Sequence, residues 1–192
     1  MLRIGTVEQY RTTNLVSVSG SSRTITLALD SKLAAKAGYA TALAEVANRY
    51  NAQNLTLKFQ VVSSGANITF KNGNGSFLAS SGFPGSGNPY NSVTVNSRAI
   101  GTGTSATFVN YLATILAHET GHCIGFRHTD YMDRSYSCGG SYSNEGASTV
   151  GAILIPGTPS TADPNSWMLA CIGSGVNRPF NSNDKIALAY LY

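Results

Sequence analysis

The chain has 192 residues, of which 42% are hydrophobic and only 11% are charged, and its formal net charge is +4. This length is enough for one domain with a substantial core. Lysine and arginine form no cluster, so the sequence gives no support for nucleic-acid binding. No stretch is long and apolar enough to span a membrane, and the opening residues lack the apolar region of a signal peptide.

The first third of the chain predicts two strands with a helix between them. Residues 1–22 show no periodicity and are expected to be a loosely packed lead-in. Residues 23–30 and 55–62 alternate apolar and polar side chains, which predicts a strand in each. Residues 32–51 are rich in alanine and carry a helical apolar stripe. The order strand–helix–strand favours a parallel pair joined by a right-handed crossover.

Further short elements lead to a long helix. Residues 66–71 predict a third strand, and residues 72–91, rich in Gly, Ser and Asn, predict a long loop. Residues 91–96 predict a short strand directly before a helix over residues 105–124. One side of that helix is apolar and should be packed, through Val109, Leu112, Leu116 and Cys123.

All three histidines of the chain lie in one eleven-residue stretch that begins in this helix. They are His118, His122 and His128. Residues four apart on a helix lie about 40° apart around its axis, so His118 and His122 project from one face and can share a metal ion. Glu119 lies at the edge of that face. It is badly placed to be a ligand but well placed to reach a water on the metal.

The third histidine requires the chain to turn back. On a continued helix His128 would point about 120° away from the other two. Gly125 is where the helix can end, because glycine adopts a left-handed conformation without a Cβ penalty. Three imidazoles leave a fourth position open, which is typical of catalytic zinc. The sequence therefore predicts one catalytic zinc ion. It contains no EF-hand loop and leaves calcium binding undecided.

The remainder of the chain differs in character. Residues 129–181 are dense in Ser, Gly, Asn and Pro and predict mostly loops, before a final helix capped by Ser182 or Asn183. We expect an α/β upper lobe, with a twisted mixed sheet and helices, and a mostly irregular lower lobe that ends in a helix. The whole chain is then one domain, with an upper subdomain over residues 1–124 and a lower one over residues 125–192.

Three cysteines permit one disulfide and one free thiol. Cys138 and Cys171 both lie in loop-like sequence, where a disulfide would help a region short of regular structure. Cys123 lies on the packed stripe of the long helix. We expect the pair Cys138–Cys171, although spacing alone leaves a bond from Cys123 to either partner open. A disulfide indicates an oxidising compartment, which favours a secreted or periplasmic protein.

The spacing from His118 to His128 resembles the extended zinc motif of the metzincin clan of metallopeptidases. The second mark of that clan is a downstream turn that contains methionine, and Ser166-Trp167-Met168-Leu169-Ala170 offers one. The resemblance covers most of the chain and implies a metzincin-like catalytic domain. The resemblance implies that the zinc ligands are His118, His122 and His128. It also implies that Glu119 is the general base and that Met168 forms the platform beneath the metal.

Within the clan, residues 125–130 and 183–188 are similar to the bacterial dual-action HEIGH metallopeptidases, with Thr120 in place of isoleucine. The run Gly125-Phe126-Arg127-His128 is also similar to astacins. Astacins, however, carry a tyrosine two residues after the turn methionine, where this chain has Ala170. The residue that assists the scissile carbonyl is therefore left open, and the tyrosines of the lower lobe near the motif are Tyr131, Tyr136 and Tyr142.

The resemblance also implies where a substrate binds. In the clan an extended peptide pairs antiparallel with a strand at the upper rim of the cleft, a role that would fall to Val93, Thr94 and Val95. We expect a monomeric endopeptidase that acts on proteins or peptides. Two other functions stay open, namely an inactive zinc-stabilised binding module and a zinc hydrolase of cell-wall peptides.

Overall fold

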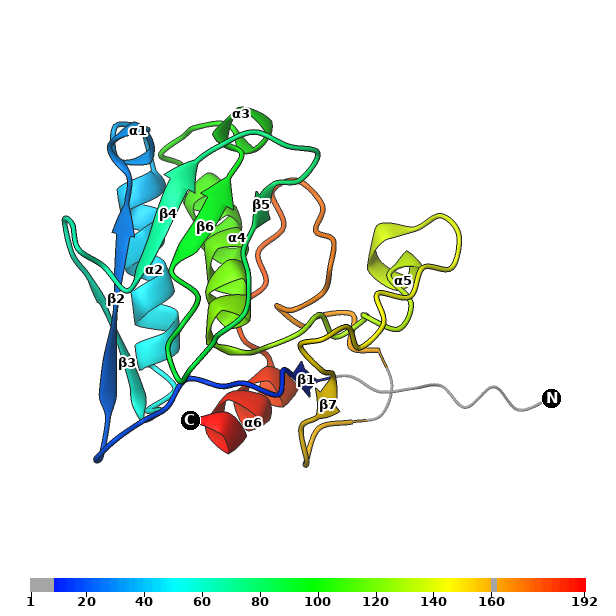
Figure 1. The fold of residues 1–192 in the computed structure, drawn as a ribbon. Coiled ribbons are helices and arrows are strands. Elements are labelled where there is room, and N and C mark those ends of the chain that lie inside the picture. Colours follow the sequence, from blue (N-terminus) through cyan, green and yellow to red (C-terminus); the bar gives the residue numbers. More distant parts are fainter. Residues whose placement is uncertain (1–8, 160–161) are drawn as a thin grey trace.

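The computed structural model describes residues 9–159 and 162–192. The regular elements follow the chain in the order shown in Figure 1. The strands are β1 (Tyr10–Arg11), β2 (Arg23–Leu29), β3 (Leu57–Val61), β4 (Ile68–Asn72), β5 (Ala79–Ser80), β6 (Ser92–Val95) and β7 (Ile153–Leu154). The helices are α1 (Ser31–Ala34), α2 (Tyr39–Asn51), α3 (Ser97–Ile100), α4 (Ala106–Ile124), α5 (Ser135–Cys138) and α6 (Ser182–Leu191).

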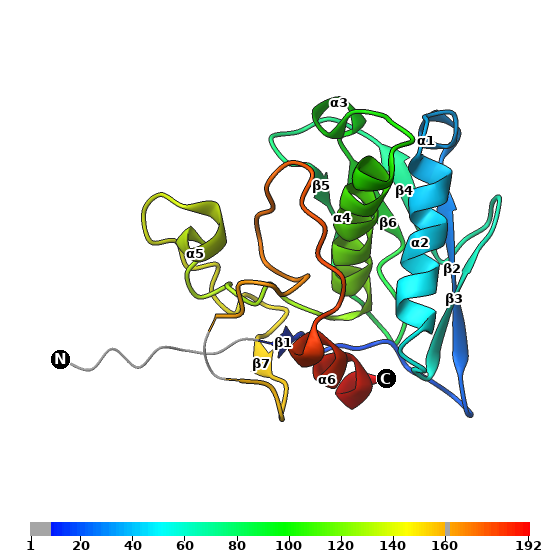
Figure 2. The ribbon, with the colours of Figure 1, turned by 180° about the vertical axis from the view of Figure 1, so that it is seen from behind.

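A five-stranded mixed sheet forms the upper part of the molecule. Its strand order is β3-β2-β4-β6-β5, in which the first four strands are parallel and β5 is antiparallel to β6. The predicted strand–helix–strand unit is therefore a parallel pair, β2 and β3, connected through α2. Helices α2 and α4 cover one face of the sheet, as the view from behind shows (Figure 2).

The core lies between this sheet and the two helices. Alternation along β2 buries Ile25 and Leu27, whereas Thr24 is exposed on the opposite side of the strand. Leu43 of α2 and Leu112 of α4 are fully buried against the same layer. Each such side chain contributes about 1.5–3 kcal/mol relative to exposure. The core thus fixes the side of α4 that faces the sheet and leaves the other side for the histidines.

The helix expected over residues 32–51 is divided into α1 and α2. The break is at Gly38, which has φ +87°. A Cβ at this position would also collide with the backbone oxygen of Gly103. Glycine is therefore required here both for its backbone conformation and for the close approach of the segment before α4.

The expectation of a loosely packed lead-in is wrong from residue 9 onward, and residues 1–8 lie outside the described residues. Gln9, Tyr10 and Val16 are buried. Strand β1 pairs antiparallel with β7, where Tyr10 is opposite Leu154. Residues from both sides of the expected subdomain boundary at 124–125 therefore share this small sheet.

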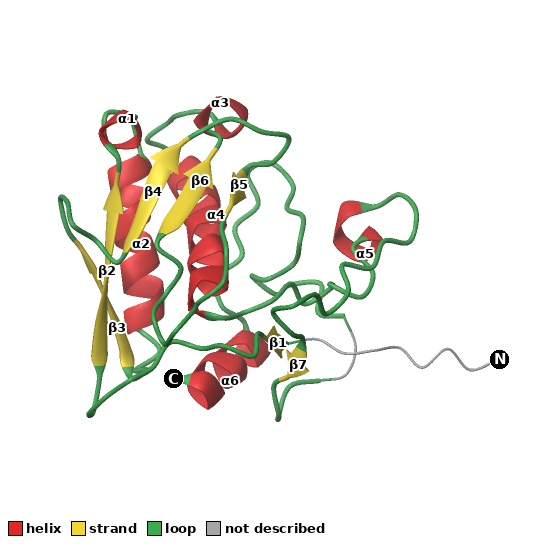
Figure 3. Cartoon of the chain, viewed as in Figure 1, coloured by secondary structure: helices red, strands yellow, loops and turns green. Residues whose placement is uncertain are grey.

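The region after α4 is mostly loop, with α5, β7 and α6 as its regular elements (Figure 3). Helix α6 is capped by Asn181, one residue before the expected cap, because its side chain accepts a hydrogen bond from the Asp184 backbone in a capping box. No helix in the described part of the chain is long and apolar enough to cross a membrane.

The substrate-edge role expected for Val93, Thr94 and Val95 is contradicted by the sheet order. Strand β5 pairs with β6 through Ala79 and Ser80, which oppose Val95 and Thr94. The edge strand beside α4 is therefore β5, and Val93 and Val95 are fully buried. The sequence did not reveal β5, because a two-residue strand within a Gly- and Ser-rich loop has no periodic pattern.

Candidate metal centre

The histidine cluster is built by one helix and the turn that follows it. His118 and His122 project from α4 on one face. The helix ends at Gly125, which has φ +116° and whose backbone N–H bonds to Gly121 O and His122 O. The chain then returns His128 to the helix, so that its Nε2 lies 3.2 Å from His118 Nε2 and 3.1 Å from His122 Nε2. The turn expected at Gly125 is the one that the structure contains.

Each of the three histidines is oriented by a contact at its other ring nitrogen. Nδ1 of His118 lies 2.8 Å from Trp167 O, and Nδ1 of His122 lies 2.7 Å from Phe126 O. Both acceptors are backbone carbonyls, so each Nδ1 carries the proton and each Nε2 offers a lone pair. The protein thereby aims three Nε2 lone pairs at a common point, all within 4.8 Å of one another.

Burial keeps the helical histidines neutral. Desolvation, followed by the neighbouring His128, lowers the pKa of His118 to about 3. The same causes, in the same order, lower the pKa of His122 well below its usual value. A neutral imidazole is the form that binds a metal. The donor set and its protonation state therefore fit a divalent cation such as zinc.

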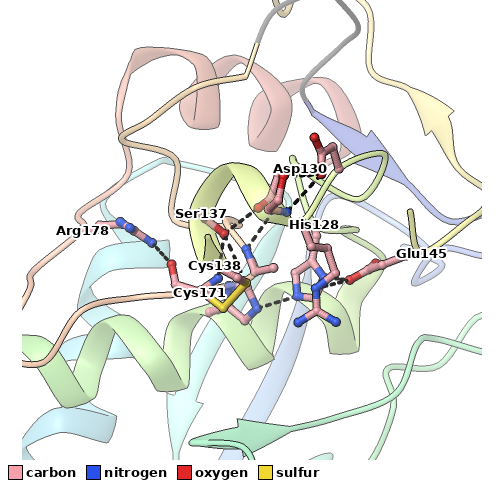
Figure 4. Close-up of a disulfide and its surroundings, with 12 residues drawn as sticks. His128, Asp130, Ser137, Cys138, Glu145, Cys171 and Arg178 are labelled. Carbon is pink, nitrogen blue, oxygen red and sulfur yellow. Dashed lines mark hydrogen bonds and ion pairs between the residues drawn. A yellow bond between two sulfur atoms is a disulfide. The ribbon is translucent and has the colours of Figure 1, made fainter. Parts of the chain in front are cut away.

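Glu145 is a site residue that the sequence analysis missed. Its Oε1 accepts a 2.5 Å hydrogen bond from His128 Nδ1, and Arg127 and Arg134 form ion pairs with its carboxylate at 3.4 and 3.2 Å (Figure 4). Burial alone would raise the pKa of Glu145, but the contacts with His128 and the two arginines outweigh it and lower this pKa. A charged carboxylate therefore orients His128, whereas backbone carbonyls orient His118 and His122.

Glu119 is buried beside the ligands, and its carboxylate does not join the group of three ligand atoms. Its Oε2 accepts a 2.7 Å hydrogen bond from Ser81 Oγ, in the segment that follows β5. Burial raises the pKa of Glu119 to about 7, although the Ser81 hydrogen bond acts in the opposite direction. A carboxyl whose pKa lies near neutrality is suited to proton transfer. No sequence pattern indicates Ser81, which is 38 residues from Glu119 along the chain.

Met168 lies directly beneath the zinc-motif helix. Its side chain is fully buried, and a Cβ added at Gly121 would come within 2.7 Å of its Sδ. The backbone oxygen of Met168 accepts from Thr129 N at 3.0 Å, which ties the methionine turn to the segment after His128. Glycine at position 121 is thus required for close packing between the helix and the methionine.

The other expected residues are placed as follows. Cys138 and Cys171 form a disulfide with an S–S distance of 2.08 Å, and Cys123 is a buried free thiol. Among the described residues that line the cavity at the metal centre, none is a tyrosine. Tyr136 Oη donates to Ala162 O, and Tyr142 is exposed, so neither is placed to assist a carbonyl. Tyr131 is buried against Arg127 and also lies outside that cavity.

The metal centre opens into a cavity of about 800 Å³. Strand β5 and the residues around it line the cavity, and so does the segment after Met168. His118, His122, His128 and Glu119 all line the cavity. An extended chain can therefore reach the ligand cluster and the carboxylate from outside.

Comparisons with known proteins agree with this geometry. Myroilysin, a solved structure, matches with a TM-score of 0.55 at 16% identity, covering 95% of this chain and 98% of that one, which shows a shared fold. A GM1-bound AB5 holotoxin structure matches at 17% identity with a TM-score of 0.44, over 64% of this chain and 62% of that one. Comparison with curated proteins gave no significant match. The sequence matches the dual-action HEIGH metallopeptidase family over residues 2–192, and the chain therefore belongs to that family of metallopeptidases.

Proposed function

We propose that this metallopeptidase is a zinc-dependent endopeptidase in which Glu119 is the general base. The observation that carries the proposal is the convergence of three Nε2 atoms beside a buried carboxylate in an open cavity. Three imidazoles with room for a further ligand suit a single catalytic zinc ion. Zinc, when bound, supplies a Lewis acid that lowers the pKa of water and polarises the scissile carbonyl.

The chain's own residues then handle the proton and the substrate. Ser81 Oγ holds Oε2 of Glu119, which leaves Oε1 to accept the proton of the attacking water and to pass it to the departing nitrogen. Strand β5 lies at the edge of the sheet and lines the cavity, so it takes the place that sequence analysis gave to β6. An extended peptide can pair with it antiparallel.

The decisive experiment compares Glu119→Ala with His122→Ala. Glu119→Ala should keep the fold and one zinc per chain but lose about 10²–10⁴-fold in peptide hydrolysis, because only the proton acceptor is removed. His122→Ala should lose zinc as well as activity. Glu45→Ala removes a partly buried carboxylate on α2 that pairs with Arg49 and lies outside the cavity lining, and it serves as the control. Zinc content and turnover of a proteome-derived peptide library, with and without a chelator, are the measurements.

The outcomes separate the competing functions. If zinc-loaded wild-type protein cleaved neither peptides nor protein, the inactive binding module would be favoured. The presence of Glu119 argues against that function. Cleavage of peptidoglycan bridges in preference to protein would favour the cell-wall hydrolase. If Glu119→Ala hydrolysed peptides as fast as wild type, the proposed zinc site would stand, but Glu119 would not be the general base.

We further propose that the enzyme acts as a secreted or periplasmic monomer. The Cys138–Cys171 disulfide supports an oxidising compartment, since such bonds are rare in reducing cytosol. The three ligands, the carboxylate and the cavity walls all come from one chain, so the site needs no second copy. Size-exclusion chromatography with light scattering measures the oligomeric state directly.

A further inference from the structure

The cavity at the metal centre contains one arginine that lacks an acidic partner. Arg127 and Arg134, which also line the cavity, form ion pairs with Glu145. The other carboxylate among the described lining residues is Glu119, which lies at the metal centre. Arg178 lines the same cavity and forms no ion pair with any carboxylate in the described part of the chain. A half-buried guanidinium without a countercharge is costly to keep in a protein wall unless a ligand supplies that charge.

The carboxylate whose charge acts on Arg178 already accepts other hydrogen bonds. The charge of Asp130 acts on Arg178. Its Oδ1 accepts from the Ala170 backbone at 2.9 Å, and its Oδ2 accepts from Ser137 Oγ at 2.5 Å. Asp130 therefore organises the loop around the disulfide and forms no ion pair with Arg178, as the separation of the two residues in Figure 4 also shows.

Arg178 is held in position by contacts that leave most of its donors free. Its backbone N–H donates to Thr114 Oγ1 at 3.0 Å, and its Nη1 donates to Cys171 O at 2.8 Å (Figure 4). Cys171 is itself fixed by its disulfide to Cys138. A guanidinium has five N–H donors, and the hydrogen bonds in the described residues use one of them. The side chain is thus preoriented without being saturated.

The surroundings of Arg178 place it close to the reacting atoms. Thr114 and Ile115 of α4, about one helical turn before His118, line the cavity together with Leu169 and Ile172. The hydrogen bond from the Arg178 backbone to Thr114 holds this arginine against α4, about one helical turn before His118. Among the described residues, the cavity therefore has a mostly apolar wall that carries one cation without an ion-pair partner, near one metal ligand.

We propose that Arg178 selects peptides with an acidic side chain next to the scissile bond. This inference rests on the proposed peptidase function. A residue adjacent to the bond that is cleaved must lie beside the metal ligands, and on the His118 side its carboxylate would meet the guanidinium. A carboxylate can accept two parallel hydrogen bonds from an arginine, and the partly desolvated wall strengthens that contact.

The test compares substrates that differ in one charge. Peptides with Asp, Asn, Glu or Gln at either position flanking a cleaved bond are assayed for kcat/KM. Wild type should prefer the acid over its amide by about 10–100-fold at one of these positions, the range expected for hydrogen bonds to a charged group. Arg178→Gln should lower this ratio to near one while amide peptides are cleaved within a few-fold of the wild-type rate.

Two further variants make the result specific. Arg98→Gln removes an exposed positive charge on α3 that is not part of the cavity lining, and it should leave the ratio unchanged. Arg178→Lys keeps the charge and should retain a preference for acids, which guards against a folding defect in Arg178→Gln. Equal cleavage of acidic and amide peptides by wild type, or an unchanged preference in Arg178→Gln, overturns the inference and leaves the peptidase function standing. A wild type that cleaves no peptide removes both.

Discussion

The metal centre combines residues that one helix and its turn bring together with residues that reach it from distant segments. His118 and His122 project from one face of α4, and the turn at Gly125 returns His128 to them. Glu145 was not predictable, because it is 17 positions from His128 along a mostly irregular segment whose one helix, α5, has only four residues. The same holds for Ser81, which reaches Glu119 only through the sheet edge. Contacts between loops leave no pattern in one sequence.

Removing the carboxylate of Glu145 should weaken zinc binding. Glu145→Ala takes away the acceptor that orients His128, and changes in such supporting residues typically lower metal affinity by about 10–100-fold. Glu145→Gln keeps an acceptor oxygen and should lie between wild type and Ala. The dissociation constant is measured by competition with a chromogenic chelator, with Glu45→Ala as the control. Unchanged affinity in Glu145→Ala would contradict an orienting role.

Met168→Ala should lower stability while the protein still binds zinc. The side chain is fully buried against Gly121, and large-to-small changes in a core cost about 2–5 kcal/mol. Met132→Ala alters a methionine that is only partly buried and should cost less. Urea unfolding gives the free-energy differences, and metal analysis gives zinc content. Loss of zinc from a folded Met168→Ala protein would argue against a packing role.

At the scale of elements, long periodic segments were predicted well and short ones were not. Strands β2, β3, β4 and β6 and helix α4 occur close to their expected bounds, because each has an apolar side that must be buried. Strands β1 and β7 pair across about 140 residues of sequence, and two residues are too few for a period. Their pairing depends on packing of the whole chain, which explains why the lead-in was misjudged.

The turn that ends α4 gives a prediction at this scale. Gly125→Val should weaken zinc binding, since φ is +116° there and an added Cβ would lie 2.6 Å from Leu15 Cδ2. The displaced turn would carry His128 away from the other ligands. Gly20→Val is a matched control, because Gly20 also has positive φ, at +82°, but has nothing within 4 Å of an added Cβ. If both variants bind zinc as tightly as wild type, His128 does not depend on this turn.

At the scale of the whole molecule, a few long-range links hold the loop-rich region after α4. The disulfide is one link. Asp184 is another, because its carboxylate accepts from Gln9 Nε2 at 2.6 Å, Ser166 Oγ at 2.8 Å and the Trp167 backbone at 3.2 Å. It therefore joins the N-terminal segment, the methionine turn and α6. A metal held by α4 and the following turn adds a third link, so metal binding should be coupled to global stability.

The pH dependence of unfolding tests this coupling. Folded His118 has a pKa of about 3 against 6.5 when unperturbed, so between these values the unfolded chain binds a proton that the folded chain does not. Stability from this neutral histidine is present above pH 6.5 and is lost as the pH falls toward 3. His122 acts in the same direction. Glu119 and Asp184 oppose them, since burial raises their pKa values to about 7 and about 6, so that the two carboxyls offset the two histidines until the pH falls below about 4.5.

Below about pH 4.5 Glu119 no longer offsets the histidines, so the metal-free protein should become less stable on further acidification, by at most about 1.4 kcal/mol per pH unit for each histidine. Zinc binds only the neutral imidazoles of the folded state, so it should raise the unfolding midpoint near neutral pH and make the loss on acidification steeper. Urea titrations over this pH range, with zinc and with a chelator, measure both effects. Metal-free stability that stays flat or rises on this further acidification would mean that the helical histidines are not held neutral by the fold. An unfolding midpoint that zinc does not change would mean that the cluster does not couple the turn after α4 to the rest of the molecule.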